Sequence, residues 1–218
     1  MAPSIEEIRS SYDTGAKYYD FAVRLYGLIG IRKAYRIRAV KLLGLQPGDR
    51  AVELGCGTGL NFPFIVEQIG PEGGLIGVDI SPKMLAYARE RVEREGWKNI
   101  ELVQSDIVAY KFPDRVNAVL STGVFGYIAE CDHVIKAASQ ALVPDGRLAI
   151  LDGKRSERLP SLIFKLILRL SRSFGVTSDY FEKRTWESVE RCFRETAFEQ
   201  MYKGMFYISY GTAPFQQS

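Results

Sequence analysis

The chain has 218 residues, of which 46% are hydrophobic and 25% are charged, and its formal net charge is +3. These values are close to globular averages and exclude a disordered, collagen-like or low-complexity chain, while the length favours one α/β or all-β domain over two. No uncharged apolar run reaches the length of a bilayer span, and the N-terminus lacks the layout of a secretory signal, so we expect a cytoplasmic protein.

Three cysteines and one histidine limit the chemistry further. Cys56, Cys131 and Cys192 lie far apart, have no CxxC spacing and are odd in number, so a disulfide framework is not expected. The single histidine, His133, leaves too few nitrogen and sulfur ligands for a zinc or two-histidine iron site. We therefore expect no metal.

The hydrophobic periodicity changes near residue 50. Residues 4–44 have helical spacing, and the turn at 47–49 leads into a short apolar strand over 50–54. From there the pattern predicts helices at 60–69, 82–95 and 131–142, and strands at 75–79, 100–105, 116–120 and 147–151. Alternating strands and helices indicate βαβ units, hence an α/β fold with a doubly wound parallel sheet that binds ligands beyond the strand carboxyl ends.

The pattern changes again after Asp152. A cationic apolar stretch occupies 154–175, and a helix is predicted over 186–193. The segments 198–203 and 205–210 read as an antiparallel strand pair joined at Gly204.

The most informative stretch is Glu53-Leu54-Gly55-Cys56-Gly57-Thr58-Gly59. Alternate glycines between a buried strand and a helix allow a tight turn and let a ligand lie against main-chain amides. Leu60 stands where a dinucleotide fingerprint has its third glycine, and the Gly-Lys-Ser/Thr of a P-loop is absent. The loop therefore predicts a ligand cradle, and phosphate cofactors become less favoured.

Two acids follow the next two strands. Asp79 ends the second strand, where a carboxylate can accept two hydrogen bonds from a ribose diol. Asp106 follows the third strand and can receive an exocyclic amine, while Ile80, Met84 and Ile107 could enclose a flat adenine. Either acid alone could be a helix cap or a solvated turn, but their order and spacing favour an adenosine site.

Four motifs occur in order over residues 50–152: VELGCGTG, GVDISP, QSDI and LVPDGRL. They resemble the successive motifs of class I S-adenosylmethionine-dependent methyltransferases. Shorter matches at Tyr19-Asp20, Tyr35-Arg36 and 59–63, with the closing strand at 204–211, resemble the branch of the quinone C-methyltransferases and the bacterial phospholipid N-methyltransferases.

This resemblance implies a Rossmann-like, mostly parallel seven-stranded sheet with an antiparallel C-terminal strand pair. It divides one methyltransferase domain into N-terminal lid helices (1–45), a cofactor-binding core (46–153), an amphipathic basic insertion (154–185) and a C-terminal helix with the strand pair (186–218). The cofactor-binding residues that it implies are Glu53, Gly55, Cys56, Gly57, Thr58, Gly59, Asp79, Ile80, Met84, Asp106, Ile107 and Ser121. Glu53 would orient the loop or the cofactor's amino group, and Ser121 would line the gap where acceptor and sulfonium meet.

Methyl transfer from a sulfonium depends mainly on alignment and exclusion of water, so a strong base is optional. His133 reads as a surface or satisfied helix residue. The candidate catalytic residues are tyrosines: Tyr19 in the predicted lid helices and Tyr127 after the fourth strand, since a phenol can donate to or accept from a nucleophile and close the site. With twelve tyrosines in the chain, ordinary packing is the competing interpretation.

Positive charge is concentrated in two apolar segments. Residues 21–48 contain no acid and carry +6, and residues 154–172 carry +5. On a helix beginning near Pro160, Arg158, Lys165, Arg169 and Arg172 share a face opposite an apolar one. Both segments could pack on the sheet, but together they suggest a face that docks on anionic lipid at the inner side of the membrane. No RNA-binding module is recognisable, so we expect no nucleic-acid partner.

The sequence therefore predicts an enzyme that uses S-adenosylmethionine to methylate a small lipophilic acceptor, with a phosphatidylethanolamine-type amine ahead of a quinone-ring carbon or another small molecule. A nicotinamide-linked oxidoreductase is disfavoured by Leu60 and by the lack of a Tyr-x-x-x-Lys pair. A catalytically silent cofactor-binding subunit is the remaining alternative.

Overall fold

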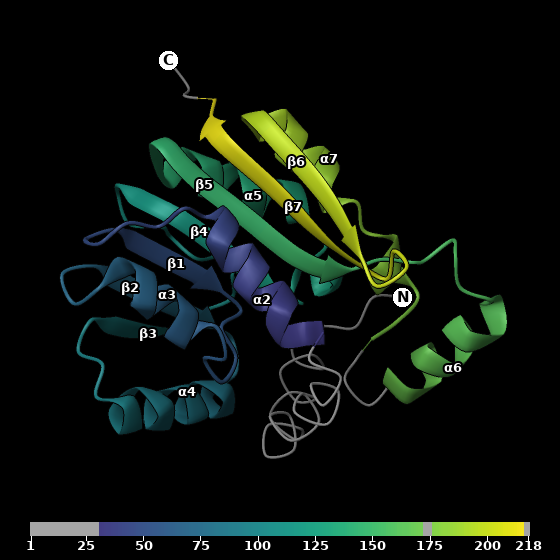
Figure 1. Cartoon of the computed structure of the whole chain (residues 1–218), viewed down its shortest axis with the longest axis horizontal. Coiled ribbons are helices and arrows are strands. Elements are labelled where there is room, and N and C mark those ends of the chain that lie inside the picture. The colour runs from purple at the N-terminus through teal and green to yellow at the C-terminus, as the bar shows by residue number, and fades with distance from the viewer. Residues whose placement is uncertain (1–30, 172–175, 216–218) are drawn as a thin grey trace.

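A computed structural model describes residues 31–171 and 176–215 (Figure 1). Seven strands form one mixed sheet in the order β3-β2-β1-β4-β5-β7-β6. These strands are β1 (Arg50–Leu54), β2 (Gly74–Asp79), β3 (Ile100–Gln104), β4 (Val116–Thr122), β5 (Leu142–Gly153), β6 (Phe193–Met201) and β7 (Phe206–Pro214). The first five run parallel, and β7 is antiparallel to both β5 and β6. The seven-stranded fold expected from the motifs is confirmed.

Helices cover both faces of this sheet. They are α2 (Ile31–Leu42), α3 (Phe62–Ile69), α4 (Pro82–Glu95), α5 (Cys131–Ala141), α6 (Ser161–Ser171) and α7 (Thr185–Cys192), with the 3₁₀ turns η1 (Phe125–Tyr127) and η3 (Asp179–Glu182). One hydrophobic core lies under α2, α3 and α4, and a second lies under α5 and α7. Figure 1 shows α6 standing apart from both layers.

The helix that follows β2 shows how local sequence fixes an element. The Ser81 hydroxyl accepts the N–H of Met84 at 3.1 Å, Pro82 occupies the first turn, and Gly96 closes the helix in a left-handed conformation with φ +71°. A serine cap, an early proline and a terminal glycine are strong helix boundaries. Helix α4 therefore begins three residues after Asp79, which holds that acid at the rim of the sheet.

The strand boundaries differ from expectation on the C-terminal side. The strand predicted at 147–151 is β5, which runs from Leu142 to Gly153 because β7 pairs with it along Arg147–Gly153 and β4 pairs with Leu142 across a register shift. The strand predicted at 198–203 is β6, which begins at Phe193. Most of β6 is exposed, so its apolar residues give no clear alternation.

The basic helix predicted from near Pro160 also differs. It begins at Ser161, so Arg158 precedes it and does not share its face, and Arg172 lies outside the described residues. The predicted lid helices before residue 31 also lie outside them. Within the described part of the chain, no helix has both the length and the apolar character needed to cross a membrane.

Candidate active site

The glycine loop turns sharply between β1 and α3. Gly55, Gly57 and Gly59 have φ values of +66°, +55° and +73°. A Cβ on Gly55 would lie 2.3 Å from Val124, and one on Gly59 would lie 2.6 Å from Phe62, so these two glycines permit close packing. No heavy atom of the described residues lies within 4 Å of a Cβ on Gly57. The middle of the loop is therefore the part with room for a ligand.

Asp79 lies beside this open glycine. Its Oδ2 accepts the Gly57 N–H at 2.8 Å, and its Oδ1 accepts the Ser81 N–H at 2.9 Å. The carboxylate thereby connects the loop after β1 to the loop after β2, at adjoining strand ends. The predicted neighbourhood of Asp79 and Gly57 is present, and ribose binding by Asp79 stays a prediction.

The second acid belongs to the same rim. The Ser105 N–H donates to the Asp79 carbonyl at 3.1 Å, and Asp106 lies two residues beyond Gln104, where the β2–β3 pairing ends. Asp106 Oδ1 accepts the Val108 N–H at 2.9 Å, closing a local turn. Its side chain is partly exposed. Asp106 therefore combines the structural role of a turn residue with a position from which it could meet an adenine amine.

The three predicted adenine contacts differ in exposure. Ile80 is partly exposed, whereas Met84 is 1% exposed and Ile107 is 6% exposed, the latter within the core under α5 and α7. Of these three residues, Ile80 therefore has the most exposed surface available for contact with an adenine.

Three further predicted residues support the loop from within. Ser121 is fully buried, and its hydroxyl donates to the Leu54 carbonyl at 3.1 Å across the β1–β4 pairing. Burial raises the pKa of the Cys56 thiol well above its ordinary value. The Thr58 carbonyl accepts from Arg91 of α4 at 2.8 Å. These contacts fix the backbone of the loop, and contact of these residues with a cofactor is untested.

A buried polar network surrounds Glu53. Asn61 Nδ2 donates to Glu53 Oε1 at 2.5 Å, and Arg36 of α2 donates to both Asn61 Oδ1 and Thr122 Oγ1 at 3.1 Å. Glu53 is 1% exposed, and its Oε2 has no hydrogen-bond partner among residues 31–171 and 176–215. Burial raises the pKa of Glu53 to about 8, although Asn61 and Arg36 act to lower it.

Sequence reasoning assigned no role to Arg36, Asn61 or Thr122. Arg36 and Asn61 occurred only as letters in short motif matches. The network in which Arg36 donates to Asn61 and Asn61 donates to Glu53 depends on the packing of α2, α3 and β4. Arg36 is also one of the basic residues counted in the segment 21–48, yet its guanidinium is directed into this network.

The predicted catalytic residue Tyr127 ends the 3₁₀ turn η1, which follows β4. Its ring packs edge-on against Tyr180 of η3, with ring centroids 4.8 Å apart. The Tyr180 hydroxyl donates to Asp152 at the end of β5, and burial raises the pKa of Asp152 to about 6. The other predicted tyrosine, Tyr19, lies outside the described residues. Tyr180 and Asp152 were missed, although an acid ending a buried strand is the signal that identified Asp79.

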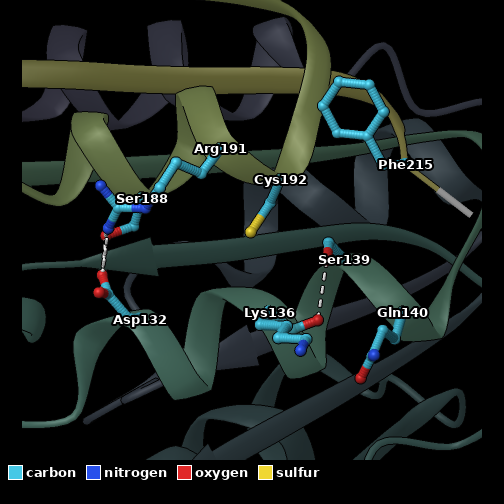
Figure 2. Close-up of a pocket in the computed structure, with 8 residues that line it drawn as sticks. All are labelled: Asp132, Lys136, Ser139, Gln140, Ser188, Arg191, Cys192 and Phe215. Carbon is cyan, nitrogen blue, oxygen red and sulfur yellow. Dashed lines mark hydrogen bonds and ion pairs between the residues drawn. The ribbon is translucent and has the colours of Figure 1, made fainter. Parts of the chain in front are cut away.

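A cavity of about 330 Å³ lies elsewhere, between α5 and α7 (Figure 2). Asp132 in its wall accepts from Ser188 and, at 2.8 Å, from Arg191. Its lining shares no residue with the glycine loop or with the acids at the strand ends. His133, next to Asp132, is exposed on α5, as expected of a surface helix residue.

The strand order, with the last strand inserted antiparallel beside β5, defines a class I S-adenosylmethionine-dependent methyltransferase fold. Three of the four motifs span the carboxyl ends of β1, β2 and β3, and the fourth forms the first part of β5. Over residues 45–196 the sequence matches the family described as methyltransferase domain, and the chain belongs to that family.

Similar curated proteins include the demethylmenaquinone methyltransferase of Lactobacillus johnsonii. It is 31% identical over 150 residues, which are 67% of this chain and 61% of that protein. The arsenite methyltransferase of Halobacterium salinarum is 32% identical over 53% of this chain and 30% of that protein. Because the chain spans less than two thirds of either relative, their substrates do not transfer with family membership.

Solved structures share the fold at low identity. Phosphoethanolamine N-methyltransferase 2 of Haemonchus contortus, in complex with phosphomonomethylethanolamine and S-adenosylhomocysteine, has a TM-score of 0.74 at 18% identity, covering 96% of this chain and 60% of that one. A SAM-dependent methyltransferase from Aquifex aeolicus has a TM-score of 0.60 at 20% identity, covering 82% and 89%.

The residues present fit the cofactor of this class. S-adenosylmethionine carries an ammonium group, which suits the buried Glu53, whose Oε2 has no hydrogen-bond partner within the part of the chain that the structure describes. It also carries a ribose diol, which suits a carboxylate beside the open Gly57. Both features adjoin the same glycine loop.

Proposed function

We propose that the protein methylates a lipophilic acceptor at a membrane surface, and that this acceptor is the amine of a phospholipid headgroup. When bound, S-adenosylmethionine supplies a methyl group that an amine lone pair can accept by in-line displacement. In this proposal Glu53 holds the cofactor's amino group, Asp79 its ribose and Asp106 its adenine amine. Gly57 provides the space for the cofactor.

The observation that carries the lipid proposal is the helix α6. Leu162 is 78% exposed and Ile163 is 46% exposed, beside the exposed cations Lys165 and Arg169. Apolar residues next to basic ones on a surface helix suit an anionic membrane interface. Arg155 adds a guanidinium over the Phe164 ring at 5.6 Å.

Aromatic contacts connect this helix to the strand ends. Phe164 of α6 packs edge-on against Phe181 with centroids 5.2 Å apart, and Phe181 packs against Tyr180 at 5.0 Å. Tyr180 in turn contacts Tyr127 and Asp152 at the acceptor side. A lipid held at α6 would therefore have its headgroup near the end of β5.

The basic segment 21–48 offers fewer cations for membrane contact than its composition suggests. Within 33–48, Arg36 is committed to Asn61 and Thr122, and Arg38 forms an exposed ion pair with Glu199 at 2.5 Å. Lys33 and Lys41 are the exposed cations outside these contacts. We therefore assign the membrane contact chiefly to α6.

A quinone-ring carbon is the second candidate acceptor. It is favoured by the similarity to the demethylmenaquinone methyltransferases of Lactobacillus johnsonii and Listeria species. Both candidates are lipophilic, so both agree with the exposed apolar residues of α6.

Product analysis separates these candidates. The purified protein is incubated with methyl-labelled S-adenosylmethionine and a total bacterial lipid extract, and the labelled lipids are resolved. Label in ethanolamine headgroups supports the proposal, whereas label in prenylated rings supports the quinone alternative. Label in neither, with cofactor binding intact, favours a catalytically silent subunit.

Membrane docking is tested by co-sedimentation with anionic vesicles at low salt. Each basic residue near such a surface contributes about 1 kcal/mol, so Arg169→Glu should lower vesicle binding more than tenfold. The matched control Arg89→Glu reverses an exposed arginine on α4 and should have little effect. Equal losses in both variants, or no binding by the wild type, would count against docking through α6.

A further inference from the structure

A second buried carboxylate has no role in the cofactor site described above. Asp152 is 2% exposed at the carboxyl end of β5. Its Oδ1 accepts from the Tyr180 hydroxyl and from the Gly153 N–H at 2.8 Å, and its Oδ2 accepts the Gly126 N–H at 3.2 Å. Burial of an ionisable group is unfavourable unless its charge is compensated, and here several donors converge on one carboxylate.

Tyr180 extends from this carboxylate toward the rim of the sheet. A Cβ on Gly126 would lie 2.2 Å from its ring, and a Cβ on Gly153 would lie 3.1 Å away, so the ring packs closely against bare backbone on both sides. Its hydroxyl oxygen lies 4.0 Å from the Cβ position of Gly123, an exposed residue just beyond β4. The phenol therefore connects the buried Asp152 to the end of a strand that adjoins β1.

We propose that Asp152 and Tyr180 form the acceptor-amine site: the pair binds the cationic headgroup and removes its proton. This inference rests on the proposed function, because it takes the acceptor to be a primary amine. The ammonium N–H bond breaks as an O–H bond forms at Tyr180 Oη, and the phenolic proton moves to Asp152. The electron pair of the broken N–H bond stays on nitrogen as the lone pair that accepts the methyl group, and Asp152 becomes neutral until its proton returns to water.

The electrostatic surroundings suit this role. A pKa of about 6 leaves Asp152 ionised at neutral pH and still a better proton acceptor than an ordinary aspartate. Tyr207 of β7 and Cys131 of α5 interact electrostatically with it. Burial raises the pKa of both groups above ordinary values that already exceed 7, so both are uncharged at neutral pH. Lys183, which follows η3, is the cation acting on Cys131 in this region.

Binding tests the pair without turnover. Full-length protein saturated with S-adenosylhomocysteine is titrated calorimetrically with glycerophosphoethanolamine. Asp152→Asn and Tyr180→Phe should each weaken this binding about tenfold or more, because a charge-assisted contact is lost. Glycerophosphocholine has no N–H to donate, so its binding should not depend on the Tyr180 hydroxyl.

Tyr207→Phe is the matched control. It removes another buried phenol near Asp152, one that bonds to Thr185 at 2.6 Å. This variant should bind the amine as the wild type does. Tyr180→Phe keeps the ring that packs on Gly126, so an unchanged affinity for S-adenosylhomocysteine verifies its fold.

The pH profile of kcat on ethanolamine vesicles separates a proton-accepting role from a structural one. Wild-type kcat should fall about tenfold per pH unit below pH 6, as Asp152 becomes protonated. Asp152→Asn should be impaired at pH 7 by about a hundredfold and recover toward pH 9, where solution deprotonates more of the amine. A defect that is constant with pH would overturn the proposal.

The two proposals fail in different ways. If the wild type methylates ethanolamine lipid and both variants keep its kcat and its headgroup affinity, only the role of the pair is refuted. If the wild type methylates no amine, the proposed function fails, and the assignment of an amine to this pair fails with it.

Discussion

Replacing Glu53 with glutamine tests the cofactor site through stability as well as binding. Glu53 is 1% exposed and its Oε2 lacks a hydrogen-bond partner among the described residues, so the folded state holds a proton there up to a pKa of about 8. In the unfolded chain a glutamate titrates near 4.3. Between these values the folded state binds the extra proton, so the free energy of unfolding falls as the pH rises.

The magnitude follows from the two pKa values. One pKa unit corresponds to about 1.4 kcal/mol, and integration from pH 6 to pH 8 gives a loss of about 2 kcal/mol attributable to Glu53. Glu53→Gln removes this titration. Relative to the wild type, the variant should therefore gain about 2 kcal/mol over that interval, whatever its stability at pH 6.

Urea unfolding of the cofactor-free protein at several pH values measures this difference. The affinity for S-adenosylhomocysteine should weaken tenfold or more in Glu53→Gln, because glutamine cannot release a proton to become the charged partner of the ammonium group. Parallel stability curves for the two proteins would show that Glu53 is ionised in the folded state. That result would refute the reasoning about its burial.

Two further substitutions address the same site. Gly57→Ala and its control Gly48→Ala both place a Cβ at positive φ with no heavy atom of the described residues within 4 Å, so both should destabilise the fold by about 1 kcal/mol. Only Gly57→Ala should also weaken cofactor binding, at least tenfold by calorimetry. Equal cofactor affinities in the two variants would show that Gly57 does not line the cofactor site. Asp79→Ala should weaken cofactor binding by an order of magnitude or more, because it removes the predicted ribose contacts and releases the Gly57 N–H; unchanged affinity would contradict the ribose assignment.

The sequence predicted the parts of this fold that depend on local pattern. The short apolar strands, the glycine turn at Gly57 and the serine-capped helix after Asp79 each have a signal within a few residues. The seven-strand architecture followed from the order of four motifs. Burial of consecutive strand residues, as in β1 and β4, makes such strands easy to recognise.

The polar connections could not be predicted in this way. Arg36 meets Thr122 across 86 positions of sequence, and Tyr180 meets Asp152 across 28. No regular sequence spacing predicts either contact, because tertiary packing brings the two residues together. The boundaries of β6 were misplaced for a different reason: its exposed, charged residues give little hydrophobic signal, and pairing with β7 defines the strand.

The position of β7 affects the order of assembly. This strand follows β6 in the chain, yet it lies between β5 and β6 in the sheet, and β6 pairs with it alone among the described strands. During synthesis on a ribosome, β6 would emerge before β7, its only neighbour among the described strands. Until β7 emerges, the edge of β5 that faces β7 would stay unpaired. The glycine turn and the acids after β2 and β3 belong to the other half of the sheet, so that half can complete its pairing before the outer hairpin docks.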